Sequence, residues 1–454
     1  MAVWSVVKKN ELEGSTRMDA EYYQPKYLSA HYELSRLNVR QLTSFCSYIK
    51  KGIFDLSPDN YCEQGIPFVR TTEIKKEIAD FDSAVYIPEE VHKKYKKTEL
   101  RSGDIVFTKI GANIGDSSIL PMLYKRYNFS QNVAGAKIKQ DKINPYYLAA
   151  YLSSKYGKFQ LKRVQMLSGQ GKLELADIRN ILIFNADEGK QESIAAIYKK
   201  TEELVDDSII LYSQAEQILL EELGLKDLDL KDDLFYTTTL KEVKNNNRMD
   251  TEYYMTKYDY IFKAIEKKGY SRLDLISKFS KILLKKKSEV FYKYIEIGGI
   301  DVSTGDVSCK EMQGCDLPTN AKLKISGGEL IISEVRPTRG AITIVPDYLT
   351  NNCLCSGSFS VFKIKSPIRE YIQVFLRSKI GKVLLGHAST GTQYPTITDE
   401  DVKAIPIPNL SNNVMENISN KVLNAHVKRE SAKALLEQAK HKVEEMIEKE
   451  AGVK

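Results

Sequence analysis

Two stretches of this chain match each other almost residue for residue: Arg17-Met18-Asp19-Ala20-Glu21-Tyr22-Tyr23 and Arg248-Met249-Asp250-Thr251-Glu252-Tyr253-Tyr254. A Lys-Tyr pair follows each of them, Lys26-Tyr27 and Lys257-Tyr258. A match of this length, separated by about half the chain, indicates a duplicated domain rather than a short solenoid repeat. We therefore expect the fold to contain the same domain twice.

The length and composition of the chain set the first limits. With 454 residues, of which 42% are hydrophobic, the chain is too long for one core and fits two domains with connecting elements. It contains no run of about 18 apolar residues. Its beginning, Met1-Ala2-Val3-Trp4, lacks the charged and apolar regions of a secretory signal. We expect a cytoplasmic protein without a membrane partner.

The cysteines and histidines do not have the spacing of a metal centre. Six cysteines are present without a Cys-x-x-Cys pair, and only five histidines accompany them. This pattern favours free thiols in a reducing compartment over structural zinc or a disulfide framework. We expect the protein to bind neither a metal nor another cofactor.

Positive charge is concentrated in two blocks of the sequence. Residues 20–186 carry 25 basic and 17 acidic side chains, a net charge of +8, and residues 251–412 carry 23 and 17, a net charge of +6. Residues 187–235 carry 5 and 14, a net charge of −9, while residues 413–454 have a net charge of about +1. Two basic bodies alternate with two segments that are not basic. A polyanionic partner for these bodies is one interpretation, and Lys-rich surfaces that only aid solubility are the other.

Strand and turn signals recur in the same order in both halves. Residues 66–70 of the first half and residues 294–297 of the second are expected to form equivalent strands. Residues 103–107 and 328–332 are each expected to form a glycine turn followed by a second strand. Both halves are therefore expected to be mixed α/β domains with many short strands.

A matched helix and a matched polar loop close each half. Residues 147–158 and 371–382 are expected to be helical, and polar, glycine-containing loops follow at residues 168–172 and 389–394. The framework is thus predicted to persist even where the side chains differ.

A long amphipathic helix follows each block. Apolar residues recur at spacings of three and four, in the first helix at Ile194, Ile197, Leu204, Leu211, Ala215 and Ile218, and in the second at Ile418, Val422, Ala425, Ala432, Leu436, Ala439, Val443 and Met446. Gly224 and Gly452 are placed to cap the ends. About 35 residues make a rod of roughly 50 Å, and such a seam favours a partner helix. We expect the two helices to pair antiparallel, the alternative being that each covers only its own domain.

Signatures of an enzyme are weak. Asn144-Pro145-Tyr146-Tyr147 resembles the loop with which adenine-N6 methyltransferases hold a flipped base, but it lacks the second proline and suits the first turn of a helix. The sequence contains no Gly-x-x-x-x-Gly-Lys-Ser/Thr loop for a nucleotide. We expect the chain to be non-catalytic.

Taken together, the chain resembles the DNA-specificity subunit of type I restriction-modification systems. The resemblance is carried by the duplicated Arg-Met-Asp-x-Glu-Tyr-Tyr motif, the Gly-Asp-Ile-Val and Gly-Glu-Leu-Ile segments at 103–106 and 328–331, the Ser-Lys-x-Gly-Lys segments at 154–158 and 378–382, and the two long helices. It covers essentially the whole chain. It implies two target recognition domains that read the halves of a split, asymmetric site in double-stranded DNA.

The resemblance also implies the domain layout and the partners. We expect an α+β fold with two tandem mixed α/β recognition domains related by a pseudo-two-fold repeat, at residues 1–186 and 227–412. The spacer helices are expected at residues 187–226 and 413–454, paired as an antiparallel coiled coil. In the family this helix pair holds the domains apart and docks two methyltransferase subunits, and the restriction and translocation subunit joins that core.

Polar and basic side chains on the variable loops are the candidate DNA contacts. In the first domain they are Arg70, Thr71, Thr72, Lys109, Asn113, Gln170 and Lys172, and in the second they are Arg336, Thr338, Arg339, Thr392, Gln393 and Tyr394. Arg336 and Arg339 suit guanine best, because a guanidinium can donate to both of its acceptors. The repeated Arg17, Asp19, Arg248 and Asp250 are interpreted as scaffold or partner-docking residues, since both copies keep them.

Two other functions remain open from the sequence. The chain could be a non-catalytic protein–protein scaffold whose basic surface is incidental, in which case no salt-sensitive DNA binding is expected. It could also be a stand-alone modification enzyme, in which case the isolated chain would transfer methyl groups.

Overall fold

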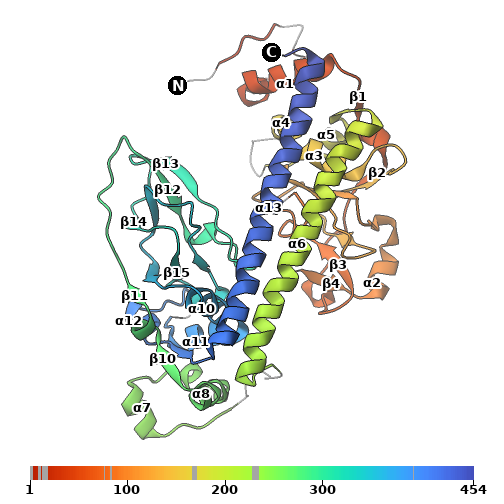
Figure 1. The fold of residues 1–454 in the computed structure, drawn as a ribbon. Helices are drawn as coiled ribbons and strands as arrows, with labels where there is room; N and C mark the ends of the chain where they lie inside the picture. The colour runs from red at the N-terminus through yellow and green to blue at the C-terminus, as the bar shows by residue number, and fades with distance from the viewer. Residues whose placement is uncertain are drawn as a thin grey trace. The chain divides into compact units, whose positions relative to one another are not determined.

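The computed structural model describes residues 4–8, 12, 19–75, 77–81, 84–165, 171–226, 235–391 and 393–453. The chain divides into two units, Met1–Asp206 with Lys428–Lys454, and Asp207–Val427. Each unit contains one block of short strands and helices together with one end of each long helix (Figure 1).

In the described residues of the first unit, three small sheets form the strand framework. Four strands pair antiparallel in the order β2-β8-β5-β6, three follow the order β4-β3-β7, and β1 pairs with β9. Their bounds are β1 Val39–Gln41, β2 Cys46–Lys51, β3 Ile66–Val69, β4 Val85–Ile87, β5 Ile105–Thr108, β6 Ser117–Ile119, β7 Asn128–Phe129, β8 Val133–Ile138 and β9 Leu182–Phe184. Strands β3 and β5 are buried along their whole length, in agreement with the apolar residues 66–69 and 105–107.

Short α-helices complete this block. They are α1 Pro25–Ser35, α2 Glu89–Lys94, α3 Pro145–Ser153, α4 Lys155–Arg163 and α5 Leu175–Arg179. Residues of α1, α3 and α4 enter one core with the four-stranded sheet, and fully burying an aliphatic or aromatic side chain of this kind contributes about 1.5–3 kcal/mol. Asn144 caps α3 by accepting a hydrogen bond from the Tyr146 amide at 3.0 Å, so Pro145 occupies the first turn as expected.

Over the described ranges, the second unit has the same sheets as the first, with one additional strand. The orders are β11-β18-β15-β16, β13-β12-β17-β14 and β10-β19. The bounds are β10 Tyr270–Arg272, β11 Lys278–Phe279, β12 Phe291–Ile295, β13 Lys310–Gln313, β14 Ala321–Lys324, β15 Glu329–Ser333, β16 Ile342–Ile344, β17 Cys353–Ser356, β18 Phe359–Lys363 and β19 Pro406–Pro408. In both units one central strand pairs parallel with a distant one, β3 with β7 and β12 with β17, so the repeat extends to the topology.

The helices of the second block follow the first block in order. They are α7 Leu240–Asn246, α8 Thr256–Lys268, α9 Leu273–Ile276, α10 Ile368–Arg377, α11 Lys379–Ala388 and α12 Asp399–Ala404. Helix α8 follows the second copy of the repeated motif as α1 follows the first, and α10 to α12 repeat α3 to α5. The prediction of a duplicated mixed α/β domain is confirmed.

The helix predicted over residues 147–158, and its repeat over 371–382, is broken in the structure. Ser154 and Ser378 have extended backbones that separate α3 from α4 and α10 from α11. Gly157 and Gly381 then lie so close to the preceding helix that a Cβ would come within 2.4 Å and 2.1 Å of backbone atoms. The Ser-Lys-x-Gly-Lys pattern therefore encodes a tight corner between two helices.

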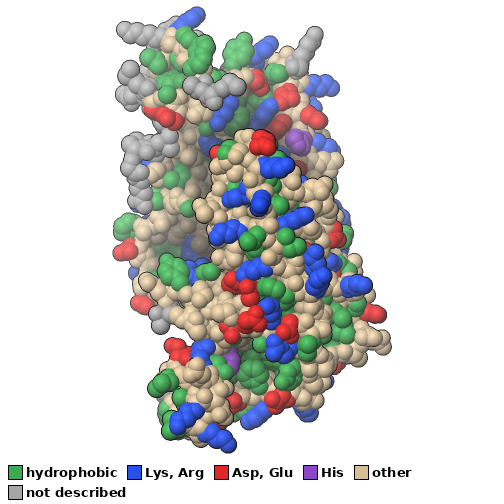
Figure 2. Space-filling view, turned by 90° about the vertical axis from the view of Figure 1, so that its left-hand side faces the viewer, with side chains coloured by type: hydrophobic (Ala, Val, Ile, Leu, Met, Phe, Trp, Pro, Cys, Tyr) green, Lys and Arg blue, Asp and Glu red, His purple; other side chains and the backbone are tan. Residues whose placement is uncertain are grey.

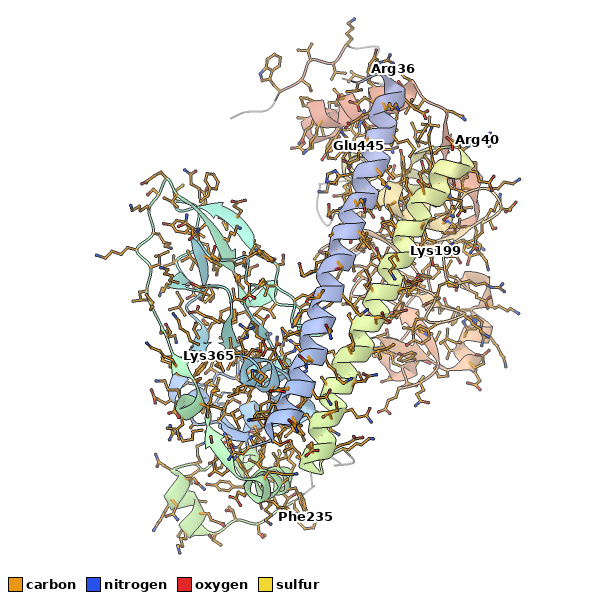
Figure 3. All side chains as sticks on the ribbon, in the orientation of Figure 1. Arg36, Arg40, Lys199, Phe235, Lys365 and Glu445 are labelled. Atoms are coloured by element: carbon orange, nitrogen blue, oxygen red, sulfur yellow. The ribbon has the colours of Figure 1, made fainter. Side chains whose placement is uncertain are left out.

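The long helices are α6 Glu188–Leu223 and α13 Asn412–Ala451, and they pack together in both units. In the first unit Lys190 Nζ lies 2.6 Å from Glu450 Oε1, and in the second Lys421 Nζ donates to Gln214 Oε1 at 2.8 Å. The start of each helix thus lies beside the end of the other, so the predicted antiparallel pairing is confirmed. Lys199 on α6 and Glu445 on α13 mark the pair in Figure 3.

Glycines end both long helices as predicted. Gly224 has φ +67° and Gly452 has φ +69°, the left-handed region that glycine adopts without steric cost. The following amides of Leu225 and Val453 donate back to carbonyls in the last turn at 2.9 Å. Within the described ranges, none of the helices is long and apolar enough to cross a membrane.

Candidate nucleic-acid interface

In each unit two loops at equivalent positions contact each other. One follows β5 or its repeat β15, and the other follows α4 or its repeat α11. In the first unit the Leu173 amide donates to the Lys109 carbonyl at 3.0 Å, and in the second the Arg336 amide donates to the Pro395 carbonyl at 2.7 Å. The framework therefore brings together loops that lie about 60 residues apart in the sequence.

In the first unit a buried carboxylate organises the loop after β3. Glu73, which is 1% exposed, accepts hydrogen bonds from the Arg70 amide at 2.6 Å, from Arg70 Nη2 at 2.8 Å and from the Thr72 hydroxyl at 2.8 Å. The Arg70 side chain is 30% exposed and its guanidinium is fixed by this pair. Sequence reasoning identified Arg70 and Thr72 but missed Glu73, whose role follows only from its burial.

The candidates Arg70, Thr71 and Thr72 line an open cavity of about 320 Å³. Tyr61 and Phe68 contribute aromatic surface to it, and the 130–132 turn closes another side. The cavity combines polar side chains with flat apolar surface at the edge of the first unit.

Lysines gather where the two loops of the first unit meet. Burial lowers the pKa of the Lys109 ammonium, and the positive charges of Lys51 and Lys172 act in the same direction against the attraction of Glu174. Lys172 itself forms an ion pair with Glu174 at 2.6 Å. Positive charges that act on the Lys109 ammonium in this way favour a nearby anion. The structure thus places Lys109 and Lys172 together.

Two further candidates of the first unit are less well placed. Asn113 is exposed in the turn between Gly111 and Gly115, where the Ile114 carbonyl accepts a hydrogen bond from Gln165 Nε2 at 2.7 Å. Gln170 lies outside the described residues. Neither is shown to join the lysine group.

In the second unit Arg336 stacks on a tyrosine from the other loop. Its guanidinium carbon lies 4.4 Å from the centre of the Tyr394 ring, and its backbone adopts a left-handed conformation with φ +49°. The hydrogen bond from its amide to Pro395 fixes this conformation. Tyr394 is 64% exposed, so the pair lies on the surface with the guanidinium over the ring.

The loop that carries Tyr394 is closed at its base. The Thr390 amide donates to the Thr396 carbonyl at 2.8 Å, and the Thr396 amide returns a hydrogen bond at 2.9 Å. Thr396 also bridges to Val335, which ties the loop to the chain that leads to Arg336. Gln393 is exposed at the tip, while Thr392 lies outside the described residues.

Thr338 and Arg339 lie on one short 3-10 turn beside Arg336. Both are exposed, and the Arg339 amide donates to the Arg336 carbonyl at 3.0 Å. A Cβ on Gly386 of α11 would come within 2.9 Å of the Thr338 methyl group. Arg336, Thr338 and Arg339 therefore lie together on one turn, and Tyr394 packs against Arg336.

A polar network that the sequence did not reveal lies beside the end of the strand that precedes Arg336. Lys281 Nζ lies 2.7 Å from both Glu334 Oε1 and Asp399 Oδ2, and the Ser360 hydroxyl donates to Glu334 at 3.0 Å and to Asp399 at 2.6 Å. Burial raises the pKa of Glu334, against the hydrogen bond from Lys281. These residues are scattered over more than 100 positions, so no local pattern could have linked them. The network fixes the strand end that leads into Arg336.

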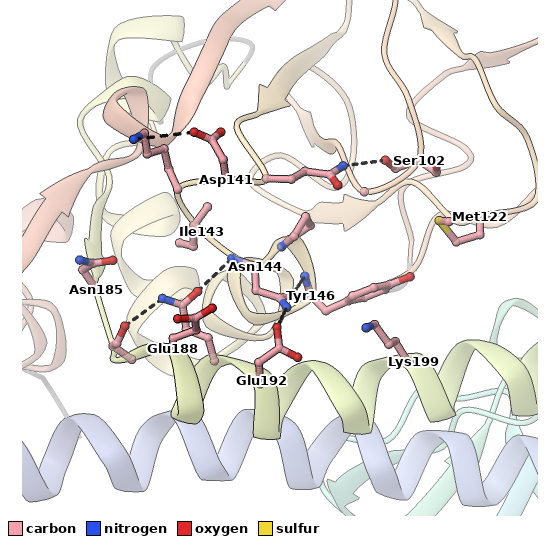
Figure 4. Close-up of a pocket in the computed structure, with 16 residues that line it drawn as sticks. Ser102, Met122, Asp141, Ile143, Asn144, Tyr146, Asn185, Glu188, Glu192 and Lys199 are labelled. Atoms are coloured by element: carbon pink, nitrogen blue, oxygen red, sulfur yellow. Dashed lines mark hydrogen bonds and ion pairs between the residues drawn. The ribbon is translucent and has the colours of Figure 1, made fainter.

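A larger polar cavity of about 630 Å³ lies between α3, the 140–143 turn and the start of α6 (Figure 4). Asn144 lines it, but its amide oxygen caps α3 and its Nδ2 donates to Glu192 Oε1 at 3.0 Å. The Tyr146 hydroxyl donates to Glu202 Oε2 at 2.8 Å. The Asn-Pro-Tyr-Tyr segment therefore fastens α3 to α6.

Basic side chains are widely spread on the face drawn in Figure 2, with acidic side chains in smaller groups. Across the described ranges, the structure contains no group of three or more His, Cys, Asp or Glu side chains placed to hold a metal ion.

Comparison with known proteins shows what the first block resembles. Residues 35–208 match the model of the type I restriction modification DNA specificity domain. No curated protein matches the sequence. Among solved structures, the S subunit of a type I restriction-modification system from M. genitalium matches at 14% identity and TM-score 0.40, over 91% of this chain and 95% of that one. The HsdS subunit from Thermoanaerobacter tengcongensis matches at 13% identity and TM-score 0.28, over 90% and 95%.

The first block thus matches the type I specificity-domain model over residues 35–208, and the resemblance drawn from the repeated motif is confirmed there. The second block repeats its sequence landmarks and its order of elements. It is a second copy of the same domain.

Proposed function

We propose that this chain is the sequence-reading subunit of a type I restriction-modification complex, in which each domain reads one half of a bipartite, asymmetric site in double-stranded DNA. We assign residues 1–186 and 227–412 to the reading domains, and residues 187–226 and 413–454 to the helices that set the distance between half-sites. The candidate loop residues named above make the contacts.

One observation carries the proposal. Two equivalent framework positions present loops of different chemistry, a lysine group with Lys109 and Lys172 in one copy and the Arg336–Tyr394 stack in the other. A common framework with different loops suits two different target sequences. A scaffold that bound the same partner twice would instead favour the same side chains in both copies.

The side chains suit different parts of the DNA. Lysines of the first unit are suited to phosphates, which give affinity that falls with salt concentration. Arg336, held over the Tyr394 ring, can donate to O6 and N7 of guanine, and Arg339 on the same turn is the second candidate for this role. Arg70, braced by Glu73, is the corresponding candidate in the first unit.

The helices and the partners complete the proposal. At about 1.5 Å per residue, the 36 residues of α6 span roughly 54 Å. Half-sites one helical turn apart are separated by about 34–36 Å, so a helix of this length can span that separation together with the reading elements. Two methyltransferase subunits dock on the helix pair, and the restriction subunit joins through them. The chain itself performs no chemistry.

Selection from random DNA tests the proposal. The full chain, co-purified with the methyltransferase subunit, is incubated with a random duplex library at about 150 mM salt, and bound DNA is sequenced. We expect one motif with two unequal specified parts and a fixed gap. Retention of DNA without any enriched motif, or no salt-sensitive binding, would contradict the proposal and favour a protein–protein scaffold.

A further inference from the structure

The repeated motif of the second unit lies against the end of α11. The ring of Tyr253 stacks on the imidazole of His387 with centres 4.0 Å apart and an angle of 24°. Tyr258 and Phe262 pack on the same imidazole at 4.4 Å and 5.3 Å. His387 is the last residue but one of α11, directly before the loop that carries Tyr394.

A second contact from the motif reaches the first residue of that loop. Arg248 binds Asp250 through two hydrogen bonds of 2.7 Å, and its Nη2 also donates to the Ser389 carbonyl at 3.1 Å. The Tyr254 hydroxyl donates to the Arg248 carbonyl at 2.8 Å, which holds the arginine in place. The motif therefore fixes two positions, His387 and Ser389, where the reading loop begins.

The first unit makes the equivalent contact with a different side chain. Arg163, the last residue of α4, lies with its guanidinium carbon 4.1 Å from the Tyr22 ring centre, and its Nε donates to the Tyr22 carbonyl at 3.1 Å. Arg163 is only 8% exposed. Tyr22 and Tyr253 hold the same place in the repeated motif, and Arg163 and His387 each follow the lysine that begins the helix by eight residues.

The guanidinium of Arg163 in the first unit and the imidazole of His387 in the second thus pack on equivalent tyrosines of the repeated motif. Both are flat groups that cover the ring face, which is the property that the two copies share. The reading loops of the two units differ in sequence, whereas both units keep this contact. The contact therefore belongs to the framework that supports the reading loops.

We infer that the repeated motif is a positioning clamp for the reading loops: Tyr22 with Arg163 in the first unit, and Tyr253 with His387 in the second, fix the start of the loop that follows α4 or α11. The inference rests on the proposed function for its consequence on DNA, whereas the clamp itself can be tested without DNA. Under this inference the repeated motif has a scaffold role and not a partner-docking role.

The motif also offers a matched control. Met249 is 87% exposed, so its side chain is available to a partner but does not contribute to the clamp. If the motif docked a partner, Met249→Ala would weaken assembly with the methyltransferase subunit. If the motif is a clamp, Met249→Ala leaves the loop unchanged.

Hydrogen exchange on the full chain tests the clamp directly. The amides of Thr390 and Thr396 close the reading loop and report on its order. We expect His387→Ala and Tyr253→Ala to accelerate their exchange at least about tenfold and Met249→Ala to leave it unchanged. Tyr22→Ala, the same substitution in the other unit, should also leave these amides unchanged. His387→Arg should retain protection, because Arg163 covers Tyr22 in the same way.

Two results would overturn the inference. One is wild-type protection of Thr390 and Thr396 in His387→Ala, which is at a half-buried position and should fold even if Tyr253→Ala does not. The other is a His387→Arg variant as poorly protected as His387→Ala. On DNA, His387→Ala should lower discrimination at one half-site at least about fivefold and leave the other half-site and complex assembly unchanged. Loss of assembly with intact protection would identify the motif as a docking element.

Discussion

At the scale of single residues, Arg336 is the position where structure and function are most closely connected. A left-handed backbone at a residue other than glycine costs about 1 kcal/mol or more, and the surrounding structure has to maintain it. The hydrogen bond to Pro395 and the stack on Tyr394 do so here. This conformation directs the guanidinium onto the ring of the neighbouring loop, which supports a role in recognition.

Substitution of Arg336 should change specificity more than affinity. Arg336→Ala is expected to reduce discrimination at one guanine of one half-site by about 1–3 kcal/mol, and Arg336→Lys should restore little of it because lysine lacks the bidentate geometry. Methylation rates on duplexes with each base at each position provide the measurement. Lys109→Ala is the control: it should weaken all sequences about equally and reduce the salt slope by about 1. If Arg336→Ala lowered the methylation rate equally on all duplexes, Arg336 would contact only phosphate.

His387 makes the second unit sensitive to acid. Burial among aromatic rings, with a smaller effect of the Arg248 charge, lowers the pKa of His387 to about 4, although Asp250 and Asp259 oppose the shift. Between pH 6.5 and pH 4 the unfolded imidazole binds more protons than the folded one. The stability that the neutral ring contributes is therefore complete above pH 6.5 and lost as the pH falls towards 4, by on the order of 2 kcal/mol.

Urea unfolding at pH 7 and pH 4.5 measures this effect. We expect the stability of the second unit to fall less between these pH values in His387→Gln than in the wild-type chain, because glutamine does not titrate. Identical pH dependence of the two proteins would show that His387 is not held neutral.

At the scale of elements, much of the fold could be predicted and the reasons are local. The glycine turn at 103–107, the proline that begins α3 and the glycines that end α6 and α13 each depend on backbone preferences of neighbouring residues. The break between α3 and α4 was missed, because Ser154 and Gly157 are compatible with a helix until the close approach of the two helices is known.

The candidate surfaces could be predicted only in part. Loop position and side-chain type were sufficient to nominate Arg336 and Tyr394, although nothing in the sequence links two residues 58 positions apart. Glu73 acts through its burial, and Lys281 acts through partners that are 53 and 118 positions away in the sequence. Sequence patterns encode neither property. The contribution of each nominated residue to DNA reading stays a prediction.

The pairing of α6 with α13 is expected to stabilise each unit. Ile447 is fully buried in the core of the first unit with Ile194 and Tyr198, so Ile447→Ala should lower the free energy of unfolding of that unit by about 2–5 kcal/mol. Val427 on the same helix is 63% exposed, and Val427→Ala should change it by less than about 0.5 kcal/mol. Urea midpoints of the two variants would be compared, and equal shifts would argue against a packed helix pair.

At the scale of the whole molecule, two copies of one framework carry different loops. Each copy carries its own reading loops, so we expect their contributions to recognition to be independent. We expect the losses in Arg336→Ala and Arg70→Ala to add within about 0.5 kcal/mol in the double variant, measured as methylation rate on the full site. A larger coupling energy would mean that both arginines act on one shared part of the DNA.

The central claim is that each copy reads its own half of a bipartite site. The most direct measurement is the sequencing of methylated adenines in cells that express this chain with its methyltransferase subunit. The account predicts methylation within one asymmetric two-part motif with a fixed gap, and a relaxed base in only one part when Arg336 is replaced by Ala. Methylation that does not depend on this chain, or a relaxation that affects both parts equally, would contradict it.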